Sequence, residues 1–350
     1  MRGTLQPHSD AEGLVNPQTR FNGAAMQPNI LILATGGTIA GRSGSALRRD
    51  YRPGQIGIGE LLERVQPLLP HAKLEGRELA AIGSEDITTR LWRDIWSECD
   101  AAMRNEAVSG IVITHGTDTA EETALLLDLT LPTTKPVVLV GAMRPADAVG
   151  SDGLRNLVNA VRAAADREAA GRGVLLVMGD RVIAARDARK ARTSGTDAFK
   201  GFPRDAVGLV TPHSLDWFGA PWEAGRAARF AFPAQFADVP ILHAYATMEA
   251  EAVDRNILPA SRGLVLAGFG EGNAPRSVRD RLAELARGGV VVVRASRVDE
   301  GLVDREPEDD AAGFVAARSL GPAKARILLQ VLLANGIGAP EQVQEAFDRR

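Results

Sequence analysis

The architecture of this chain is set by the stretch Ile30-Leu31-Ile32-Leu33-Ala34-Thr35-Gly36-Gly37-Thr38, an apolar run that ends in two glycines and a threonine. A second stretch has the same form, Gly110-Ile111-Val112-Ile113-Thr114-His115-Gly116-Thr117. Each apolar run is predicted to be a buried strand. Because α/β sheets bind ligands in the crevice at the carboxyl ends of neighbouring parallel strands, Thr38 and Thr117 are expected to face one small cavity. Two threonine hydroxyls placed there suit acyl transfer by a threonine nucleophile.

The composition is that of an ordinary globular protein: 350 residues, of which 45% are hydrophobic and 24% charged. At roughly 100–200 residues per domain, this length predicts two domains. The formal charge of −3 and the pI near 6.0 offer no basic face, so no nucleic-acid partner is expected. Cys99 is the single cysteine, which excludes an internal disulfide, and its acidic neighbours favour a structural role for it.

Residues 1–26 differ in composition from the rest, being polar with scattered proline and glycine. We interpret them as a disordered extension, or as sequence upstream of a start at Met26. They contain no apolar block of the roughly 7–15 residues that a secretory signal needs. No run in the chain approaches the roughly 18 apolar residues of a membrane helix. We therefore expect a cytoplasmic protein with no membrane partner.

From residue 27 onward, predicted strands alternate with predicted helices, which is the signature of a parallel sheet. The pattern lapses over 220–239, so we expect an α/β protein of two domains, with a larger N-terminal domain at 27–219, a linker at 220–239 and a smaller C-terminal α/β domain at 240–350. The expected strands are 30–33, 110–113, 136–140, 174–178, 241–244, 263–267 and 290–294, and the expected helices are 87–103, 120–129, 152–170, 277–286, 322–334 and 340–347.

Capping residues are expected at two helix starts. Ser151 or Asp152 can cap the helix at 152–170. Ser84 and Asp86 have two interpretations, because they lie in a polar loop just before the helix at 87–103. One interpretation is a cap for that helix, and the other is a contact with a ligand.

A threonine hydroxyl is a weak nucleophile until a base takes its proton, so a base is expected elsewhere in the chain. His115 adjoins Thr117, but it lies at a strand end where neighbouring side chains point to opposite faces, which favours a structural role. Tyr51 lies in a polar, glycine-bounded loop, and composition leaves a functional or a core role open. Lys190 lies in a charged run that is more typical of a solvated loop, although a desolvated lysine beside a hydroxyl and a carboxylate can serve as a base. No set of His, Cys, Asp and Glu has metal-ligand spacing, so no metal and no cofactor are expected.

Several blocks of the sequence closely resemble the signatures of the bacterial-type L-asparaginases and glutaminase-asparaginases. The resemblance runs from about Pro28 to the end of the chain. It implies a flavodoxin-like N-terminal domain, and it implies hydrolysis of L-asparagine to L-aspartate and ammonia. The blocks that carry it are 33–41, 113–123, 140–145, 151–153, 313–314 and 324–329.

The resemblance implies a catalytic role for five residues. Thr38 resembles the nucleophile that attacks the side-chain amide carbon and forms a β-aspartyl enzyme. Tyr51 resembles a lid residue that accepts the nucleophile's proton. Thr117, Asp118 and Lys190 resemble a second cluster that activates water or assists the nucleophile.

Substrate contacts are implied in the same way. The main-chain N–H groups of Gly37 and Thr117 are expected to hold the developing oxyanion. Ser84 is expected to bind the α-carboxylate and Asp118 the α-ammonium, while Glu85 adds negative charge around that ammonium.

The resemblance also implies that the second domain completes the site of another copy. Asn273 is expected to approach the ligand, and Glu306 to approach Tyr51 and the α-ammonium. The match at Glu306 needs a short deletion, and the acidic residues at 308–310 are close alternatives. Read without the resemblance, residues 268–272 form a strand-end turn and residues 306–310 form a solvated acidic loop. A homotetramer built as a dimer of intimate dimers is the expected assembly.

Three other functions stay open at this point. A glutaminase-asparaginase would use L-glutamine and L-asparagine comparably. An amidotransferase subunit acting on charged transfer RNA would carry an added N-terminal module, which residues 1–26 do not resemble. A ligand sensor that has lost catalysis would not be expected to keep the full catalytic set.

Overall fold

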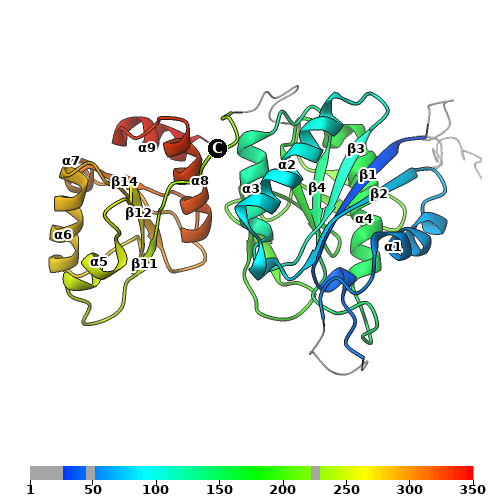
Figure 1. Ribbon diagram of the computed structural model, residues 1–350, viewed down its shortest axis with the longest axis horizontal. Coiled ribbons are helices and arrows are strands. Elements are labelled where there is room, and N and C mark those ends of the chain that lie inside the picture. Colours follow the sequence, from blue (N-terminus) through cyan, green and yellow to red (C-terminus); the bar gives the residue numbers. More distant parts are fainter. Residues whose placement is uncertain (1–26, 45–51, 222–228, 350) are drawn as a thin grey trace, which may run out of the picture.

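The computed structural model describes residues 27–44, 52–221 and 229–349. Within these residues the chain forms two α/β bodies, each built on its own parallel-dominated sheet (Figure 1). The expected fold class is confirmed. The expected extension at 1–26 lies outside the described residues, and the expected domain limits and linker stay a prediction.

The N-terminal sheet has eight strands in the order β10-β9-β6-β5-β4-β3-β1-β2. Five of them run parallel in the order β2-β1-β3-β4-β5, which is the flavodoxin-like order. The strand order reverses between β1 and β3, so the topological switch point lies between these two strands. The strands are β1 (Asn29–Gly36), β2 (Lys73–Ile82), β3 (Gly110–Thr114), β4 (Val137–Val140), β5 (Val174–Met178), β6 (Arg181–Ala184), β9 (Gly208–Val210) and β10 (Leu215–Trp217).

Helices cover both faces of this sheet, which explains why the central strands are apolar throughout. One buried cluster joins the strands to α1 (Ile58–Val65) and α4 (Gly153–Ala165). Another joins the opposite face to α2 (Thr89–Arg104) and α3 (Ala120–Thr130), as Figure 1 shows. A separate two-stranded hairpin, β7 (Ala188–Lys190) with β8 (Phe199–Gly201), lies outside the main sheet.

The C-terminal body is a four-stranded parallel sheet in the order β11-β12-β13-β14. Its strands are β11 (Ile241–His243), β12 (Gly263–Gly268), β13 (Val291–Ser296) and β14 (Phe314–Ala316). Its helices are α5 (Glu251–Asn256), α6 (Arg276–Arg287), α7 (Pro307–Ala311), α8 (Pro322–Ala334) and α9 (Pro340–Asp348).

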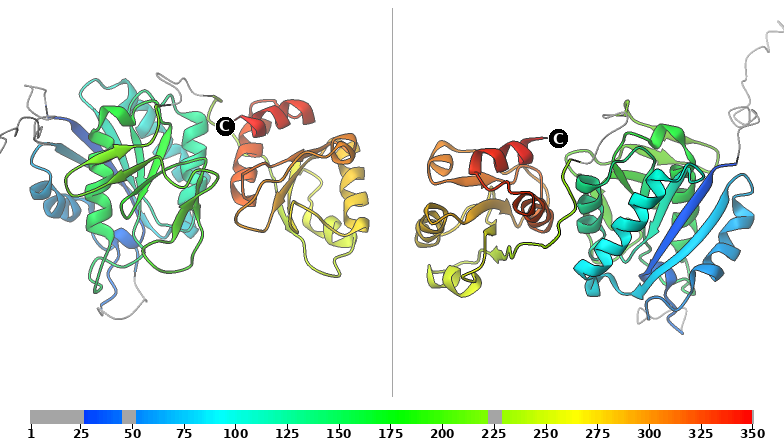
Figure 2. Two further views of the ribbon diagram at one scale, coloured as in Figure 1. Left: turned by 180° about the vertical axis from the view of Figure 1, so that it is seen from behind. Right: turned by 45° about the horizontal axis from the view of Figure 1, so that its top comes forward.

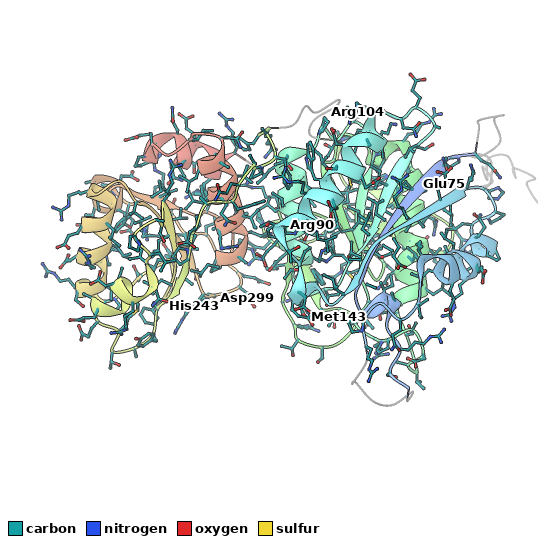
Figure 3. The ribbon with its side chains drawn as sticks, in the orientation of Figure 1. Glu75, Arg90, Arg104, Met143, His243 and Asp299 are labelled. Atoms are coloured by element: carbon teal, nitrogen blue, oxygen red, sulfur yellow. The ribbon has the colours of Figure 1, made fainter. Side chains whose placement is uncertain are left out.

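The two bodies meet through α3 and α8. Leu125 and Leu129 of α3 belong to one buried cluster with Leu328 and Leu332 of α8. Figure 2 shows the same contact from behind, with the C-terminal residues lying between the bodies. Figure 3 places Met143, which follows β4, along the same lower edge as His243, the last residue of β11. The carboxyl ends of both sets of strands therefore open to the same side.

Two local expectations are corrected by the structure. The helix at 152–170 ends at Ala165, and a short 3-10 turn, η5 (Arg167–Ala169), follows. Asp152 occupies the cap position, but its carboxylate accepts hydrogen bonds from the main-chain N–H groups of Met143 and Arg144 instead of those of its own helix. Asp152 therefore shapes the loop after β4.

Candidate active site

The turn after β1 has a backbone that only glycine accommodates. Gly36 and Gly37 have φ of +102° and +76°. A Cβ atom on Gly37 would lie 2.6 Å from the Gly116 Cα, and one on Gly36 would lie 2.5 Å from the Ile82 nitrogen. The absence of side chains therefore lets the turn after β1 press directly on the turn after β3.

Thr38 directly follows these two glycines and is the first residue of the 3-10 turn η2 (Thr38–Ala40). It is 5% exposed. The buried Thr35 Oγ1 donates a hydrogen bond of 2.8 Å to the Thr114 carbonyl oxygen. This bond ties the carboxyl end of β1 to that of β3. Thr38 and the turn that carries Thr117 are thus fixed to one another at the topological switch point.

The two amides expected to hold the oxyanion differ in their surroundings. The Gly37 N–H donates to the Ile82 carbonyl oxygen at 2.8 Å, so it points toward β2 and is already engaged. The Thr117 N–H has no acceptor among the described residues, although Thr117 is only 7% exposed. Buried main-chain N–H groups are nearly always paired, so the Thr117 amide, which no described residue accepts from, is the better placed of the two to bind a ligand.

Ser84, in the 3-10 turn η4 (Ser84–Asp86), is buried against the turn after β3. Its Oγ accepts hydrogen bonds from the N–H groups of Asp118 (3.0 Å) and Thr119 (3.3 Å). The Thr119 hydroxyl donates back to the Ser84 carbonyl oxygen at 2.8 Å. The interpretation of Ser84 or Asp86 as the cap of the following helix is wrong, because Thr88 caps α2 by accepting from the Leu91 N–H.

Lys190, at the end of β7, reaches the turn after β3. Its Nζ lies 2.9 Å from the Thr117 Oγ1 and also bonds to the Asp118 Oδ1. The lysine side chain is 17% exposed, whereas that of Asp118 is 59% exposed. The charged run around Lys190 is therefore not a solvated loop at this position.

His115 is enclosed in the interior behind the site. Its Nδ1 lies 2.7 Å from the Gly116 carbonyl oxygen, and its Nε2 lies 3.0 Å from the Thr123 Oγ1, which accepts from the Trp92 indole N–H. This set of partners assigns the proton to Nδ1. Burial lowers the pKa of the imidazole, so it stays neutral and supports the turn that carries Thr117.

Among the described residues, the other predicted site residues do not contact Thr38 or Lys190 through any hydrogen bond or ion pair. Tyr51 lies outside the described residues, and Glu85 is exposed within the turn η4. Asn273 and Glu306 are exposed, and no hydrogen bond or ion pair of the described residues joins either of them to Thr38 or Lys190.

The loops that carry Asn273 and Glu306 are held together by one buried cation. Arg294 of β13 is 2% exposed and donates to the carbonyl oxygens of Glu271 (3.0 Å) and Asp304 (2.9 Å). Its guanidinium also pairs with the buried Asp309 carboxylate at 2.6 Å. Sequence reasoning did not find Arg294, because its run of valines indicated only a strand.

The described ranges offer neither a metal-ligand cluster nor a membrane-spanning helix. Those ranges contain no group of three or more His, Cys, Asp or Glu residues that would hold a metal ion. In the same ranges, no helix is long and apolar enough to cross a membrane. Cys99 is buried in α2, and burial raises the pKa of its thiol.

Comparison with known protein families matches nearly the whole chain. The model of the asparaginase N-terminal domain matches residues 29–223, and the model of the glutaminase/asparaginase C-terminal domain matches residues 238–347. The chain belongs to the asparaginase family. The resemblance found in the sequence is confirmed, and the chain is an asparaginase-family enzyme.

Individual relatives align with this chain over most of its length and over most of their own. A probable periplasmic L-asparaginase of Haemophilus influenzae is 40% identical over 93% of this chain and 94% of its own. A glutaminase-asparaginase of Pseudomonas aeruginosa is 37% identical over 94% of this chain and 91% of its own. The crystal structure of a probable cytoplasmic L-asparaginase from Campylobacter jejuni has a TM-score of 0.86 at 34% identity, covering 91% of this chain and 99% of that one.

Proposed function

We propose that this asparaginase-family enzyme hydrolyses L-asparagine to L-aspartate and ammonia, with Thr38 as the nucleophile. One arrangement supports the proposal above all others. Thr38 is buried at the switch point, against the turn that carries Thr117, and Lys190 contacts both Thr117 and Asp118. A hydroxyl, a second hydroxyl, an ammonium and a carboxylate thus converge at the carboxyl ends of β1 and β3.

The proposed reaction has two halves. The Thr38 Oγ forms a bond to the side-chain amide carbon of asparagine while its proton passes to a base. The carbon–nitrogen bond then breaks, the nitrogen takes up a proton, and ammonia leaves a β-aspartyl ester on Thr38. Water adds to that ester, and the carbon–oxygen bond to Thr38 breaks, which returns the hydroxyl and releases aspartate.

The Thr117 amide is the proposed oxyanion donor. No described residue accepts from this N–H, which adjoins the turn that carries Thr38, and removing one such donor costs about 10²–10³ in rate in known enzymes. The Gly37 amide is left out of this proposal, because its hydrogen bond goes to Ile82. Gly37 instead serves as the contact that brings Thr38 close to Gly116.

Lys190 and Thr117 are proposed to handle protons. An ammonium group only donates, so its hydrogen bond to the Thr117 Oγ1 leaves the Thr117 hydroxyl proton directed elsewhere, toward Thr38 or water. Tyr51, which lies outside the described residues, remains the proposed acceptor of the Thr38 proton.

Recognition of the amino-acid head group follows from hydrogen-bond counting. A serine hydroxyl accepts two hydrogen bonds and donates one. Ser84 already accepts from the amides of Asp118 and Thr119, so its proton is available for the α-carboxylate. Lys190 contacts the Asp118 Oδ1, which leaves Oδ2 for the α-ammonium. The exposed Glu85 is proposed to add negative charge near that ammonium.

Completion of the site by a second copy of the chain stays part of the proposal. Asn273 and Glu306 are exposed at loops that Arg294 fixes, which suits residues that reach into another copy. The proposed assembly is a homotetramer built as a dimer of intimate dimers. The cytoplasmic location also stays a prediction.

A glutaminase-asparaginase is the second candidate, since a relative with that name is 37% identical to the chain. One methylene of substrate length is worth only about 1–3 kcal/mol in a pocket, so the same site can accept both amides. Ammonia release measured across a concentration series of L-asparagine and of L-glutamine decides between the two. Comparable kcat/KM for both substrates would favour the second candidate, and release from neither would overturn the proposed function.

A further inference from the structure

A lysine from the C-terminal body is enclosed next to the strand that carries Lys190. Lys324 of α8 is 1% exposed. Its Nζ donates to the main-chain carbonyl oxygens of Arg186 (2.5 Å) and Ala188 (2.6 Å), and Ala185 lies within 3.5 Å. All three carbonyls belong to the segment that leads from β6 into β7, and β7 ends at Lys190.

The same strand is held on its other sides. Burial raises the pKa of the Glu121 carboxylate, which is on α3 three residues beyond Asp118, and the adjacent Lys190 main chain opposes that rise. The Arg189 guanidinium donates to the Ser319 carbonyl oxygen of the C-terminal body at 3.0 Å. Lys324 and the Arg189–Ser319 bond therefore hold the backbone that leads up to Lys190, the residue whose ammonium contacts Thr117.

Packing alone does not account for a lysine at this position. An ammonium loses its hydration when it is buried, and the same volume filled by an apolar side chain would carry no such cost. Burial lowers the pKa of Lys324 to about 8. What the lysine adds is a set of donors aimed at carbonyl groups that would otherwise be buried without partners.

We propose that Lys324 is a positioning residue for catalysis, because it sets the backbone of β7 and through it the position of the Lys190 ammonium against Thr117. This inference rests on the proposed function. It also gives the C-terminal body a part in the site of its own chain, separate from the proposed contribution of Asn273 and Glu306 to another copy.

The test compares Lys324→Met with a matched control on the same helix. Gln330 of α8 is also buried, and its amide donates to the Ala237 carbonyl oxygen at 2.8 Å, away from β7. Both Lys324→Met and Gln330→Met remove hydrogen bonds from a buried side chain of α8 to main-chain carbonyls. Only Lys324→Met is expected to lower kcat for L-asparagine, by about 10–100-fold, since a displacement of about 1 Å costs up to 10²-fold.

A double variant separates positioning from general damage. If Lys324 acts through Lys190, adding Lys324→Met to Lys190→Met lowers kcat by less than about twofold further. Lys324→Gln, which keeps amide donors without the charge, is expected to lose less than Lys324→Met. Thermal unfolding of every variant reports stability independently of kcat.

Several outcomes would overturn the inference. One is a kcat of Lys324→Met within about threefold of the parent, and another is an equal loss of kcat in Gln330→Met. A third is that the losses of Lys324→Met and Lys190→Met multiply in the double variant. The last is that neither Lys324 variant folds. If the parent releases no ammonia from asparagine, the proposed function fails. If the parent is active and Lys324→Met is as active, only the positioning role fails.

Discussion

Lys190 and Thr117 are 73 positions apart in the sequence, yet the Lys190 Nζ lies 2.9 Å from the Thr117 Oγ1. The contact joins a hairpin outside the main sheet to the turn at the end of β3, one strand from Thr38. It turns two motifs that are separate in the sequence into one reactive cluster.

Lys190→Met is expected to lower kcat for L-asparagine by about 10²–10⁴-fold, because that is the usual contribution of a positioned proton-transfer group. KM is expected to change much less. Lys200→Met is the matched control, since Lys200 lies on the neighbouring strand β8 and pairs with Glu300 at 3.6 Å on the surface. Steady-state ammonia release from the three proteins measures the effect. A Lys190→Met enzyme within a few-fold of the parent would remove the second cluster from the mechanism.

Ser84→Ala is expected to raise KM and also to lower the free energy of unfolding by about 1–3 kcal/mol, because the Asp118 and Thr119 amides lose their acceptor. Ser109→Ala provides the comparison, since the Ser109 Oγ accepts from the Asn29 N–H at the opposite end of β1. Kinetics and urea unfolding are measured on both. An unchanged KM in Ser84→Ala would remove Ser84 from carboxylate binding.

Arg294→Met is expected to destabilise the C-terminal body by about 1–3 kcal/mol, because the carbonyls of Glu271 and Asp304 lose their donor while Asp309 keeps Arg279 as a partner. The double variant Arg294→Met/Asp309→Leu is expected to regain little of that stability, because it also removes the carboxylate partner of Arg279. Its kcat/KM is expected to stay low, since the carbonyls of Glu271 and Asp304 remain unheld. Full activity in the double variant would show that the loops of Asn273 and Glu306 need no such fixation.

His115 gives a pH dependence whose sign follows from burial. Its pKa in the folded protein is below the ordinary value near 6.5, so at lower pH the unfolded chain binds one more proton than the folded protein. The free energy of unfolding therefore falls as pH falls below about 6.5, approaching about 1.4 kcal/mol per pH unit for this group.

The variant His115→Gln tests that linkage. Glutamine retains an acceptor for the Thr123 hydroxyl and does not titrate in this range. Urea unfolding between pH 7.5 and 5.5 is expected to show a shallower decline for His115→Gln than for the parent. Parallel curves would mean that folding leaves the pKa of His115 unchanged.

Much of the fold was predictable because its signals are local. The apolar runs before Thr38 and Thr117 identified β1 and β3, and glycines marked the turns. Strand β2 was missed because it lies at an edge of the sheet, where its residues are largely exposed and polar. The short antiparallel strands after β5 were missed because three-residue strands have no measurable period.

The chemistry of the site was less accessible to sequence reasoning. A lysine in a charged run looks solvated until the fold shows that the hairpin brings Lys190 to Thr117. Lys324 and Arg294 act through main-chain carbonyls, which have no residue identity in a sequence. Thr35 was within the quoted motif, but only the register of β1 on β3 shows that it bonds to Thr114.

The covalent intermediate on Thr38 is the most direct test of the account. The enzyme is mixed with L-asparagine, quenched in acid within milliseconds, digested, and its peptides are weighed. The account predicts a β-aspartyl adduct on the peptide that contains Thr38, and no adduct and no ammonia release in a folded Thr38→Ala variant. An active enzyme that never carries an adduct at Thr38, or a Thr38→Ala variant with full activity, would contradict it.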